Sequence, residues 1–458
     1  MHTCFLLERF KEYGSNDAII WKNKAYSYEQ LLDGFEHSKV FLDSHQIQAG
    51  SIVVLEGDFT PKTLALMLAL IDRACLIVPL TSGMKSRELD VYEIAQAQFV
   101  IAIDAEDQAT VQSFPTTPTH ELLLAIQEQK HPGLILFSSG STGKSKATVH
   151  NFSVMLKKFS TNRKRAGKRM MGFLFFDHIG GINTLLSTLA SGGCIVTLQD
   201  RSPDEVCASI AKHNVQVLPA SPTFLNLLLL SEAYKRHDLS SLELINYGTE
   251  AMTEHTLAHM NRILPQIKLL QSYGMSEIGI IRSSSQSSNS LWMKFKGEDY
   301  ETRIVDGLLE VKSEFTMLGY LNAESRFTND GWYRTGDAVE CNGEYIRILG
   351  RQSEMINIGG EKIYPIEIEN VLLEMEEVVD VSVCGEKHII TGTMITATIQ
   401  LNYDMPAAEF RKRMRTFCKD RLPSWGIPQK CLFVQELTFG NRLKKKRVQS
   451  GGEKNVFK

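Results

Sequence analysis

The strongest chemical signal in the sequence is residues 134–146, LILFSSGSTGKSK, where an apolar run enters a loop of serine, threonine and glycine that closes with lysine. The backbone N–H groups and hydroxyls of such a loop converge on phosphate oxygens without obstruction by side chains. A Walker A loop needs glycine where Ser138 stands, so a P-loop NTPase and an ordinary Ser/Gly turn remain only as alternatives. We predict phosphate contacts from Ser138, Ser139, Gly140, Ser141, Thr142, Gly143 and Lys146.

Five further segments follow this loop along the chain. They are YGTEAM at 247–252, SYGMSE at 272–277, VKSEFTMLGYLN at 311–322, DGWYRTGD at 330–337 and GRQSEMINIGGEKIYPIEIE at 350–369. Together with the loop, and in this order, they resemble the signatures of the adenylate-forming superfamily, which comprises acyl- and aryl-CoA ligases, acyl-activating domains for carrier proteins, and luciferases. Within the loop, Ser145 and Ala147 depart from the proline and glycine that are usual in the family.

This resemblance assigns contacts with ATP to the matched residues. Glu277 corresponds to the carboxylate that holds Mg²⁺ beside the phosphates, since Mg²⁺ prefers oxygen ligands. Ser276 corresponds to the residue that bonds the α-phosphate. Asp337 is expected to accept both ribose hydroxyls, as a carboxylate can, and Arg351 is expected to reach the ribose. The adenine pocket is expected to comprise Gly248, Thr249, Glu250, Tyr273 and Gly274.

The resemblance also implies a reaction in two steps. A carboxylate attacks the α-phosphorus of ATP, pyrophosphate leaves from the opposite side and an acyl adenylate forms, while the protein mainly positions the reactants and neutralises phosphate charge. A small C-terminal domain then rotates and brings a thiol, from CoA or from the phosphopantetheine of an acyl carrier protein, to the acyl carbon. The hinge is expected near residues 352–354, with Ser353 where the family has Asp or Lys. Gly359 and Gly360 leave room for the pantetheine chain.

The acid is expected to bind where residues 175–193, FFDHIGGINTLLSTLASGG, meet the two segments at 247–252 and 272–277. His178 matches a histidine that stands beside the substrate carboxylate in many acyl- and aryl-CoA ligases, and a histidine of the core is the alternative. Asp177 does not fall on the acidic position of amino-acid-activating domains, so an amino acid is disfavoured. Walls of Phe, Ile, Leu, Met and Gly predict an apolar acid, aliphatic or aromatic.

The C-terminal end departs most from the family pattern. Family members end with Asn-Gly-Lys-Ile-x-Arg, whose lysine bridges the carboxylate and the α-phosphate, whereas this chain reads TFGNRLKKKRV at 438–448. A gapless count from FVQEL at 433–437 puts Lys444 at the lysine position, whereas matching Thr-Phe-Gly-Asn to the family's Thr-Pro-Asn-Gly puts Arg442 there. Arginine and lysine are not interchangeable in such a role. The departure leaves a nucleotide or acyl-adenylate binder, with weak or no adenylation activity, as the alternative function.

The motifs lie in a pattern of alternating strands and helices, which is typical of an α/β layered fold with a largely parallel sheet. Short β-branched and apolar runs predict strands at 17–21, 51–57, 75–80, 133–139, 172–176, 194–198, 215–220 and 242–248. We expect a large multi-layer N-terminal domain of α/β subdomains, residues 1–351, which binds ATP and the acid. Residues 352–458 are expected to form a small mobile α+β domain.

The composition excludes several other classes of protein. The chain has 458 residues, of which 43% are hydrophobic and 22% charged, as in a globular protein. Its formal net charge of −3 argues against binding to nucleic acid. No segment has the run of ~20 apolar residues that a membrane span needs, and the N-terminus lacks the apolar run of a secretory signal. A cytoplasmic location is therefore expected. Composition alone favours solvated surface for the basic runs at 163–169 and 442–447. The first could instead meet the acidic surface of a carrier protein or the phosphates of CoA, and the second contains the two candidates for the family lysine.

Overall fold

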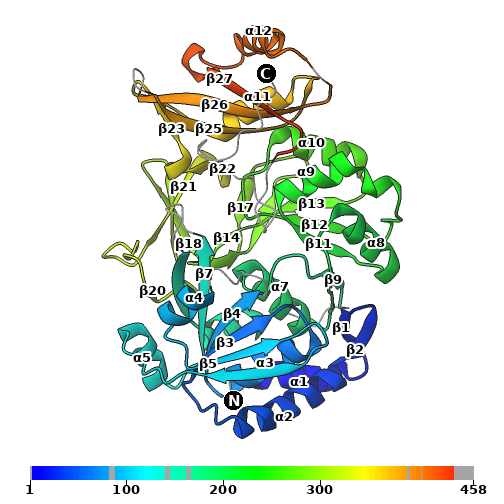
Figure 1. The fold of residues 1–458 in the computed structure, drawn as a ribbon, viewed down its shortest axis with the longest axis vertical. Coiled ribbons are helices and arrows are strands. Elements are labelled where there is room, and N and C mark those ends of the chain that lie inside the picture. Colours follow the sequence, from blue (N-terminus) through cyan, green and yellow to red (C-terminus); the bar gives the residue numbers. More distant parts are fainter. Residues whose placement is uncertain are drawn as a thin grey trace.

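The computed structural model describes residues 3–81, 88–139, 145–160, 167–388, 392–403 and 405–437. Figure 1 shows a large N-terminal domain and a small C-terminal domain that sits at one end of it. No helix among the described residues combines the length and the apolar composition that crossing a membrane requires.

One seven-stranded sheet carries the predicted phosphate loop. Its strand order is β20-β8-β7-β4-β3-β5-β6, and the pairs formed among β3, β4, β5 and β7 are parallel. The strands are β3 (Ile52–Gly57), β4 (Leu76–Thr81), β5 (Phe99–Ile103), β6 (Ala109–Ser113), β7 (Gly133–Ser139), β8 (Ser145–Asn151) and β20 (Gly319–Tyr320). The helices α4 (Glu88–Ile94) and α5 (Glu121–Glu128) cover its outer face.

A second seven-stranded sheet has the order β13-β12-β11-β9-β10-β1-β2. All its pairs are parallel except the hairpin of β1 with β2. The strands are β1 (Asp17–Trp21), β2 (Lys24–Ser27), β9 (Arg169–Met171), β10 (Cys194–Val196), β11 (Val217–Ala220), β12 (Leu244–Tyr247) and β13 (Lys268–Gln271). Its outer face packs on α8 (Pro203–His213), α9 (Pro222–Ser231), the short η1 (Ala233–Lys235) and α10 (Glu254–Ile263).

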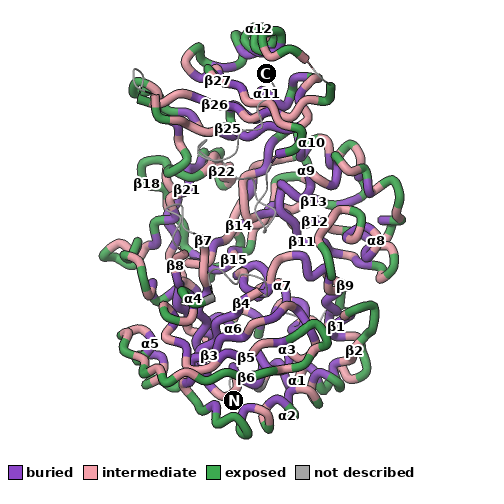
Figure 2. The backbone as a smooth tube through the Cα atoms, viewed as in Figure 1, coloured by how far each residue is buried: buried purple, intermediate pink, exposed green. Residues whose placement is uncertain are grey.

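A layer of helices fills the space between these two sheets. The helices are α1 (Cys4–Tyr13), α2 (Tyr28–Ser44), α3 (Pro61–Asp72), α6 (Phe152–Ser160) and α7 (Ile179–Ala190). Alternation along β3 explains the layering, because Val53 and Leu55 face these helices while Ile52 and Val54 face the outer ones. Helix α3 is buried over most of its length, as its continuous apolar run at residues 64–71 requires (Figure 2). The predicted multi-layer α/β fold is therefore confirmed.

An antiparallel sheet completes the N-terminal domain, in the order β16-β17-β22-β21-β19-β18. Its strands are β16 (Ser283–Ser285), β17 (Met293–Phe295), β18 (Glu301–Val305), β19 (Leu308–Lys312), β21 (Tyr333–Asn342) and β22 (Tyr345–Arg351). The small hairpin of β14 (Tyr273–Met275) and β15 (Gly279–Ile281) shares its core. The last strand, β22, ends at Arg351, where the predicted hinge begins with the short η2 (Gln352–Glu354).

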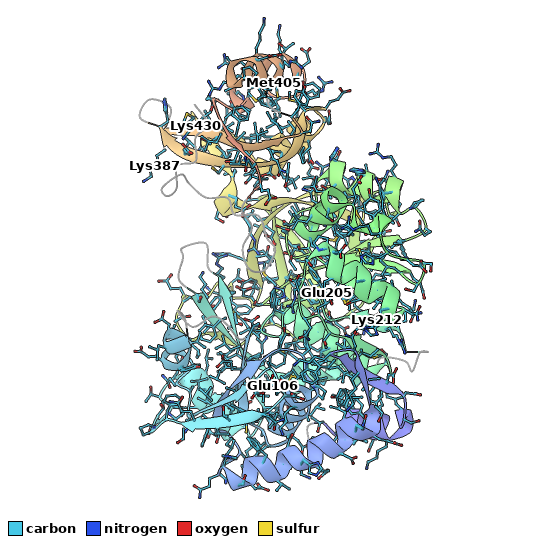
Figure 3. All side chains as sticks on the ribbon, turned by 45° about the vertical axis from the view of Figure 1, so that its right-hand side comes forward. Glu106, Glu205, Lys212, Lys387, Met405 and Lys430 are labelled. Atoms are coloured by element: carbon cyan, nitrogen blue, oxygen red, sulfur yellow. The ribbon has the colours of Figure 1, made fainter. Side chains whose placement is uncertain are left out.

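The C-terminal domain has a hydrophobic core of its own, formed by residues between Ile356 and Cys431. Its elements are β23 (Ile356–Ile358), β24 (Glu361–Ile363), α11 (Pro365–Leu373), β25 (Val378–His388), β26 (Gly392–Leu401), α12 (Ala407–Cys418), η3 (Ser424–Gly426) and β27 (Lys430–Val434). Figure 3 shows its labelled side chains, Lys387, Met405 and Lys430, well away from those of the large domain. The α+β class predicted for this part of the chain is confirmed.

One predicted strand is misplaced. Residues 172–176, GFLFF, were expected to be a strand, but the strand is β9, which ends at Met171. Phe173 and Phe176 lie in an irregular segment and belong to two different hydrophobic cores. Phe173 packs on Phe224, and Phe176 packs edge-on against Phe59. The segment was predicted to be a strand because it is apolar. An apolar run can, however, be buried without forming the hydrogen bonds of a sheet.

Candidate active site

The ends of the predicted phosphate loop lie on two adjacent strands. Strand β7 leads into the loop and β8 leads out of it, and Ser138 is paired with Lys146 in the antiparallel register. Ser139 is the last residue of β7. The structure therefore brings the first and last predicted phosphate-binding residues together. Gly140, Ser141, Thr142 and Gly143 lie outside the described residues.

Glu277 and Lys146 meet at the side chain of Tyr320. The hydroxyl of Tyr320 donates a hydrogen bond of 2.7 Å to Oε1 of Glu277, and the ammonium of Lys146 lies 5.5 Å from the centroid of the same ring. Such a distance permits a cation–π interaction. Strand β20, which carries Tyr320, pairs with β8, so the sheet itself places this tyrosine beside the loop.

A second tyrosine extends this contact. The hydroxyls of Tyr320 and Tyr333 lie 2.9 Å apart. Burial, followed by the negative charge of Glu277, raises the pKa of Tyr320 above its ordinary value. Tyr320 is therefore a protonated donor at neutral pH, and it fixes one oxygen of the Glu277 carboxylate. A carboxylate has further acceptor sites, which leaves Glu277 able to bind another partner.

His150 anchors the segment that carries Ser276 and Glu277. Its Nε2 lies 2.7 Å from the carbonyl oxygen of Ser276, and since a carbonyl can only accept, Nε2 carries the proton. Its Nδ1 is buried and has no hydrogen-bond partner among the described residues. Complete burial lowers the pKa of His150 to about 4, against a smaller opposing effect of the Ser276 carbonyl. His150 is thus a neutral tether at physiological pH.

Asp337 is held between Tyr273 and Arg351. The hydroxyl of Tyr273 donates to Oδ2 of Asp337 at 2.6 Å, and Nε of Arg351 lies 2.7 Å from Oδ1. The antiparallel register of β21 and β22 pairs Asp337 directly with Arg351, which explains their contact. Arg351 also donates to the carbonyl oxygen of Thr335 at 3.2 Å. Each carboxylate oxygen keeps acceptor capacity for a ribose hydroxyl.

Charge and burial oppose each other at Asp337. The side chain is 7% exposed, and its burial raises the pKa of the carboxyl group above its ordinary value. The positive charge of Arg351 and the hydrogen bond from Tyr273 act in the opposite direction, while the negative charges of Glu354 and Glu277 raise the pKa further. The carboxylates of Glu277 and Asp337 are therefore close enough for each charge to act on the other.

The segment after β12 comes close to the segment before β14. A Cβ atom on Gly248 would lie 2.7 Å from the carbonyl oxygen of Ser272, so only glycine fits there. Thr249 adopts a φ of 77°, which is unusual for a β-branched residue, and its hydroxyl is buried without a hydrogen-bond partner among the described residues. Strain of this kind is concentrated at functional sites. Glu250 accepts a hydrogen bond of 2.8 Å from the backbone of Thr223.

Tyr273 and Gly274 lie in β14, at the centre of this group. The ring of Tyr273 packs against Phe295, with centroids 5.6 Å apart, and the residue is 8% exposed. A Cβ atom on Gly274 would lie 2.4 Å from the carbonyl oxygen of Gly279, so the tight hairpin to β15 requires glycine. Contacts of these residues with adenine stay a prediction.

His178 has a structural role that its sequence match does not indicate. It is the N-cap residue of α7, where its Nδ1 accepts a hydrogen bond of 3.1 Å from the backbone of Gly180. In the neutral imidazole, Nε2 then carries the proton and can donate to another group. A place beside the substrate carboxylate stays a prediction. Arg442 and Lys444, the two candidates for the closing cation, lie outside the described residues.

The chemistry of Glu277 fits a magnesium ion that arrives with ATP. Among the described residues, no group of three or more His, Cys, Asp or Glu side chains could hold a metal by itself. Mg²⁺ usually binds through one or two carboxylates together with substrate phosphates and water. A single carboxylate beside the ends of the phosphate loop is the donor set that such an ion requires.

Sequence reasoning missed His150, Tyr320 and Tyr333. Tyr320 and Tyr333 lie within matched segments, GYLN and DGWY, but their contact with Glu277 joins residues that are distant along the chain. His150 could have been noticed in the sequence as a lone histidine in a strand of mostly small and β-branched residues, SKATVHN.

The whole chain is similar to proteins of one family. The model of the family described as AMP-binding enzyme matches residues 6–306, and that of the AMP-binding enzyme C-terminal domain matches residues 367–439. An indoleacetate–CoA ligase of Aromatoleum aromaticum is 26% identical over 83% of this chain and 84% of its own length. A 2-succinylbenzoate–CoA ligase of Bacillus pumilus is 25% identical over 98% of both chains.

A solved structure agrees with these relatives in fold. The anthranilate CoA ligase AuaEII, in complex with anthranoyl-AMP, superimposes with a TM-score of 0.81 at 18% identity, over 96% of this chain and 94% of that one. The expected enzyme class, an AMP-forming acid–thiol ligase, is the class of these relatives, so the resemblance found in the motifs is confirmed. Because the first family model alone matches more than half of its residues, the chain belongs to the AMP-binding enzyme family.

Proposed function

We propose that the protein activates a carboxylic acid other than an amino acid with ATP and transfers the acyl group to a thiol. In the first step the acid carboxylate displaces pyrophosphate from the α-phosphorus of ATP and forms an acyl adenylate. In the second step a thiolate attacks the acyl carbon, a thioester forms and AMP leaves. The names of the three proteins described above, each a CoA ligase, favour CoA as the acceptor, and the phosphopantetheine of an acyl carrier protein is the alternative.

The observation that carries this proposal is the meeting of Glu277 and Lys146 at Tyr320, beside the ends of the phosphate loop. A carboxylate and an ammonium that both contact one tyrosine provide a ligand for a cation and a counter-charge for phosphate oxygens. In the proposed pose, Ser276 bonds the α-phosphate and Asp337 accepts the ribose hydroxyls. Mg²⁺, when bound, would neutralise phosphate charge, and Glu277 would hold it.

We further propose that the chain divides at residues 352–354 and that the C-terminal domain moves there between the two steps. The separate core of that domain supports this division. One contact between the two domains is polar and exposed, because the backbone N–H of Glu254 in the large domain donates to Asn370 of the C-terminal domain at 3.0 Å. Interfaces of this kind permit domain motion.

Pyrophosphate exchange into ATP tests the first step. Purified protein is offered Mg²⁺, ATP, labelled pyrophosphate and a panel of aliphatic and aromatic acids, with amino acids as the negative set. We expect acid-dependent exchange with at least one non-amino-acid carboxylate, and thioester formation when CoA is added. Binding of ATP without exchange for any acid would favour a nucleotide-binding protein with no adenylation activity.

A further inference from the structure

The phosphate loop leads into β8, and the start of β8 is held by the segment that contains the short strand β20. The backbone N–H of Leu321, just after β20, donates to the carbonyl oxygen of Ala147 at 2.9 Å. The side chain of Asn322 makes the next two contacts. Its Nδ2 donates to the carbonyl oxygen of Ser145, the first residue of β8, and its Oδ1 accepts from the backbone N–H of Ala147, both at 2.9 Å. Asn322 therefore extends the pairing of the two segments to the end of the phosphate loop.

The two bonds of Asn322 hold the peptide groups on both sides of Lys146. The carbonyl of Ser145 belongs to the peptide group before Lys146, and the N–H of Ala147 belongs to the one after it. Because peptide groups are planar, only the two backbone torsion angles of Lys146 set the orientation of one group relative to the other. A change in either angle would break at least one hydrogen bond to the Asn322 amide. The amide therefore fixes the direction in which the Lys146 side chain leaves the backbone.

The same segment also holds the Glu277 carboxylate. Tyr320, two residues before Asn322, donates to Oε1 of Glu277 at 2.7 Å, and its ring centroid lies 5.5 Å from the ammonium of Lys146. Residues 319–322 therefore contact both charged groups that are expected at the phosphates. Catalysis by positioning requires such groups to be held in place before the reactants arrive, because a small displacement costs a large part of the rate.

We propose that Asn322 is a positioning residue for adenylation, which fixes the backbone of Lys146 and thereby the place of its ammonium relative to the Glu277 carboxylate. This inference rests on the proposed function and names a residue that acts through Lys146 and not on the substrate. Asn322 is exposed, so its replacement leaves no cavity in the core.

A double-mutant cycle of Asn322→Ala and Lys146→Met tests the proposal. Pyrophosphate exchange is measured for the wild type, both single variants and the double variant, with the acid of the panel that gives the wild type its highest rate. Thioester formation from CoA and the supplied adenylate of that acid is measured in parallel. The control is Asn261→Ala, because the Asn261 amide also donates to two backbone groups, the carbonyls of Leu257 and Ser288, at 2.9 and 2.8 Å.

We expect Asn322→Ala to lower the rate of exchange by about 5- to 100-fold, the range for the loss of two neutral hydrogen bonds. Thioester formation should be little changed, because an acyl adenylate carries one phosphate where ATP carries three. The double variant should exchange no more slowly than Lys146→Met, since Asn322 acts through that lysine. Asn261→Ala should behave as the wild type in both assays.

Melting temperatures check that each variant is folded. If Asn322→Ala is not folded, Asn322→Asp takes its place in the cycle. Aspartate keeps the acceptor for the N–H of Ala147 and loses the donor to the carbonyl of Ser145, so it should still lower the rate of exchange.

The outcomes that would overturn the inference differ from the one that would overturn the proposed function. Normal exchange by the Asn322 variant, an equal loss in both half-reactions, an equal loss in Asn261→Ala, or losses that add in the double variant would each overturn the inference and leave the proposed function intact. Exchange by the wild type with no acid of the panel would overturn both.

Discussion

The imidazole of His150 donates a hydrogen bond of 2.7 Å to the carbonyl oxygen of Ser276, and this contact joins the strand that leaves the phosphate loop to the residue before Glu277. The two residues are 126 positions apart in the chain, so the bond fixes one part of the site relative to another. His150 is 1% exposed and must stay neutral to avoid burying a charge.

The burial of His150 predicts a pH-dependent stability. Its pKa is lowered from 6.5 to about 4, so the folded state binds this proton more weakly than the unfolded state. The stabilising contribution of neutral His150 to the free energy of unfolding is complete above the pKa of the unfolded state. It is lost as pH falls toward the pKa of the folded state, by about 2 kcal/mol at pH 5. His150→Gln, which keeps a donor for Ser276 but does not titrate, should lack this loss. Urea unfolding at pH 7.5 and pH 5 checks it, and an equal change in both proteins would contradict it.

Loss of the Glu277 carboxylate should stop adenylation and leave the fold intact. We expect Glu277→Ala to lower the rate of pyrophosphate exchange by at least about 100-fold, because it removes a charged group at the phosphates. Thermal unfolding should be little changed. Tyr320→Phe, which keeps the Glu277 carboxylate and removes only the hydroxyl that contacts Glu277 and Tyr333, should cost much less. Normal exchange by Glu277→Ala at saturating Mg²⁺ would remove Glu277 from the mechanism.

Asp337 should govern the affinity for ATP. Asp337→Asn should raise the KM for ATP by about 100-fold, with a smaller effect on kcat, since hydrogen bonds to a charged acceptor are worth a few kcal/mol in total. The pKa of Asp337 is raised by burial, so the wild-type KM should rise as pH falls through that raised value. The variant should not show this rise. An unaltered KM would contradict the ribose assignment.

Restriction of the junction should separate the two steps. Ser353→Pro fixes φ within η2 and should reduce thioester formation more than adenylation. Ser353→Ala serves as the control and should leave both steps unchanged. Limited proteolysis should cut the native protein near residues 352–354 and release a fragment of about 350 residues. Equal loss of both steps in Ser353→Pro would argue against alternation between two domain poses.

One cation in the C-terminal run RLKKKR should be needed for the first step only. Separate alanine substitutions at Arg442, Lys444 and Lys445 are assayed for adenylation and for thioester formation from a supplied acyl adenylate. We expect one of them, with Lys444 favoured over Arg442, to lower adenylation by about 10² to 10³ while thioester formation survives. Normal adenylation by all three would mean that the first step proceeds without a cation from this run.

The sequence predicted the parallel sheets better than the antiparallel one. The strand at 133–139 agrees residue for residue with β7, because a continuous apolar run ends there at turn residues. The strands at 283–285 and 301–305 were not predicted. The first consists of three half-buried serines, and the second is mostly exposed, so neither shows an alternation of apolar and polar residues.

Residues of the candidate site were found where a motif is local, and missed where a contact is distant. Tyr273, Glu277 and Asp337 lie within short recognisable segments. The roles of His150 and Tyr320 depend on contacts that join strands far apart in the sequence, and no local pattern carries such information.

The position of Arg351 has a thermodynamic consequence. Arg351, whose guanidinium pairs with Asp337, is also the last residue before the junction with the C-terminal domain. If a nucleotide binds Asp337 more tightly in one domain pose than in the other, it also shifts the balance between the poses. Linkage is reciprocal. If bound nucleotide changes the equilibrium between the two domain poses by some factor, the nucleotide affinities of the two poses differ by the same factor. Trapping the domain, for example with a crosslink, would therefore tune the binding of AMP without any change in the residues that touch it.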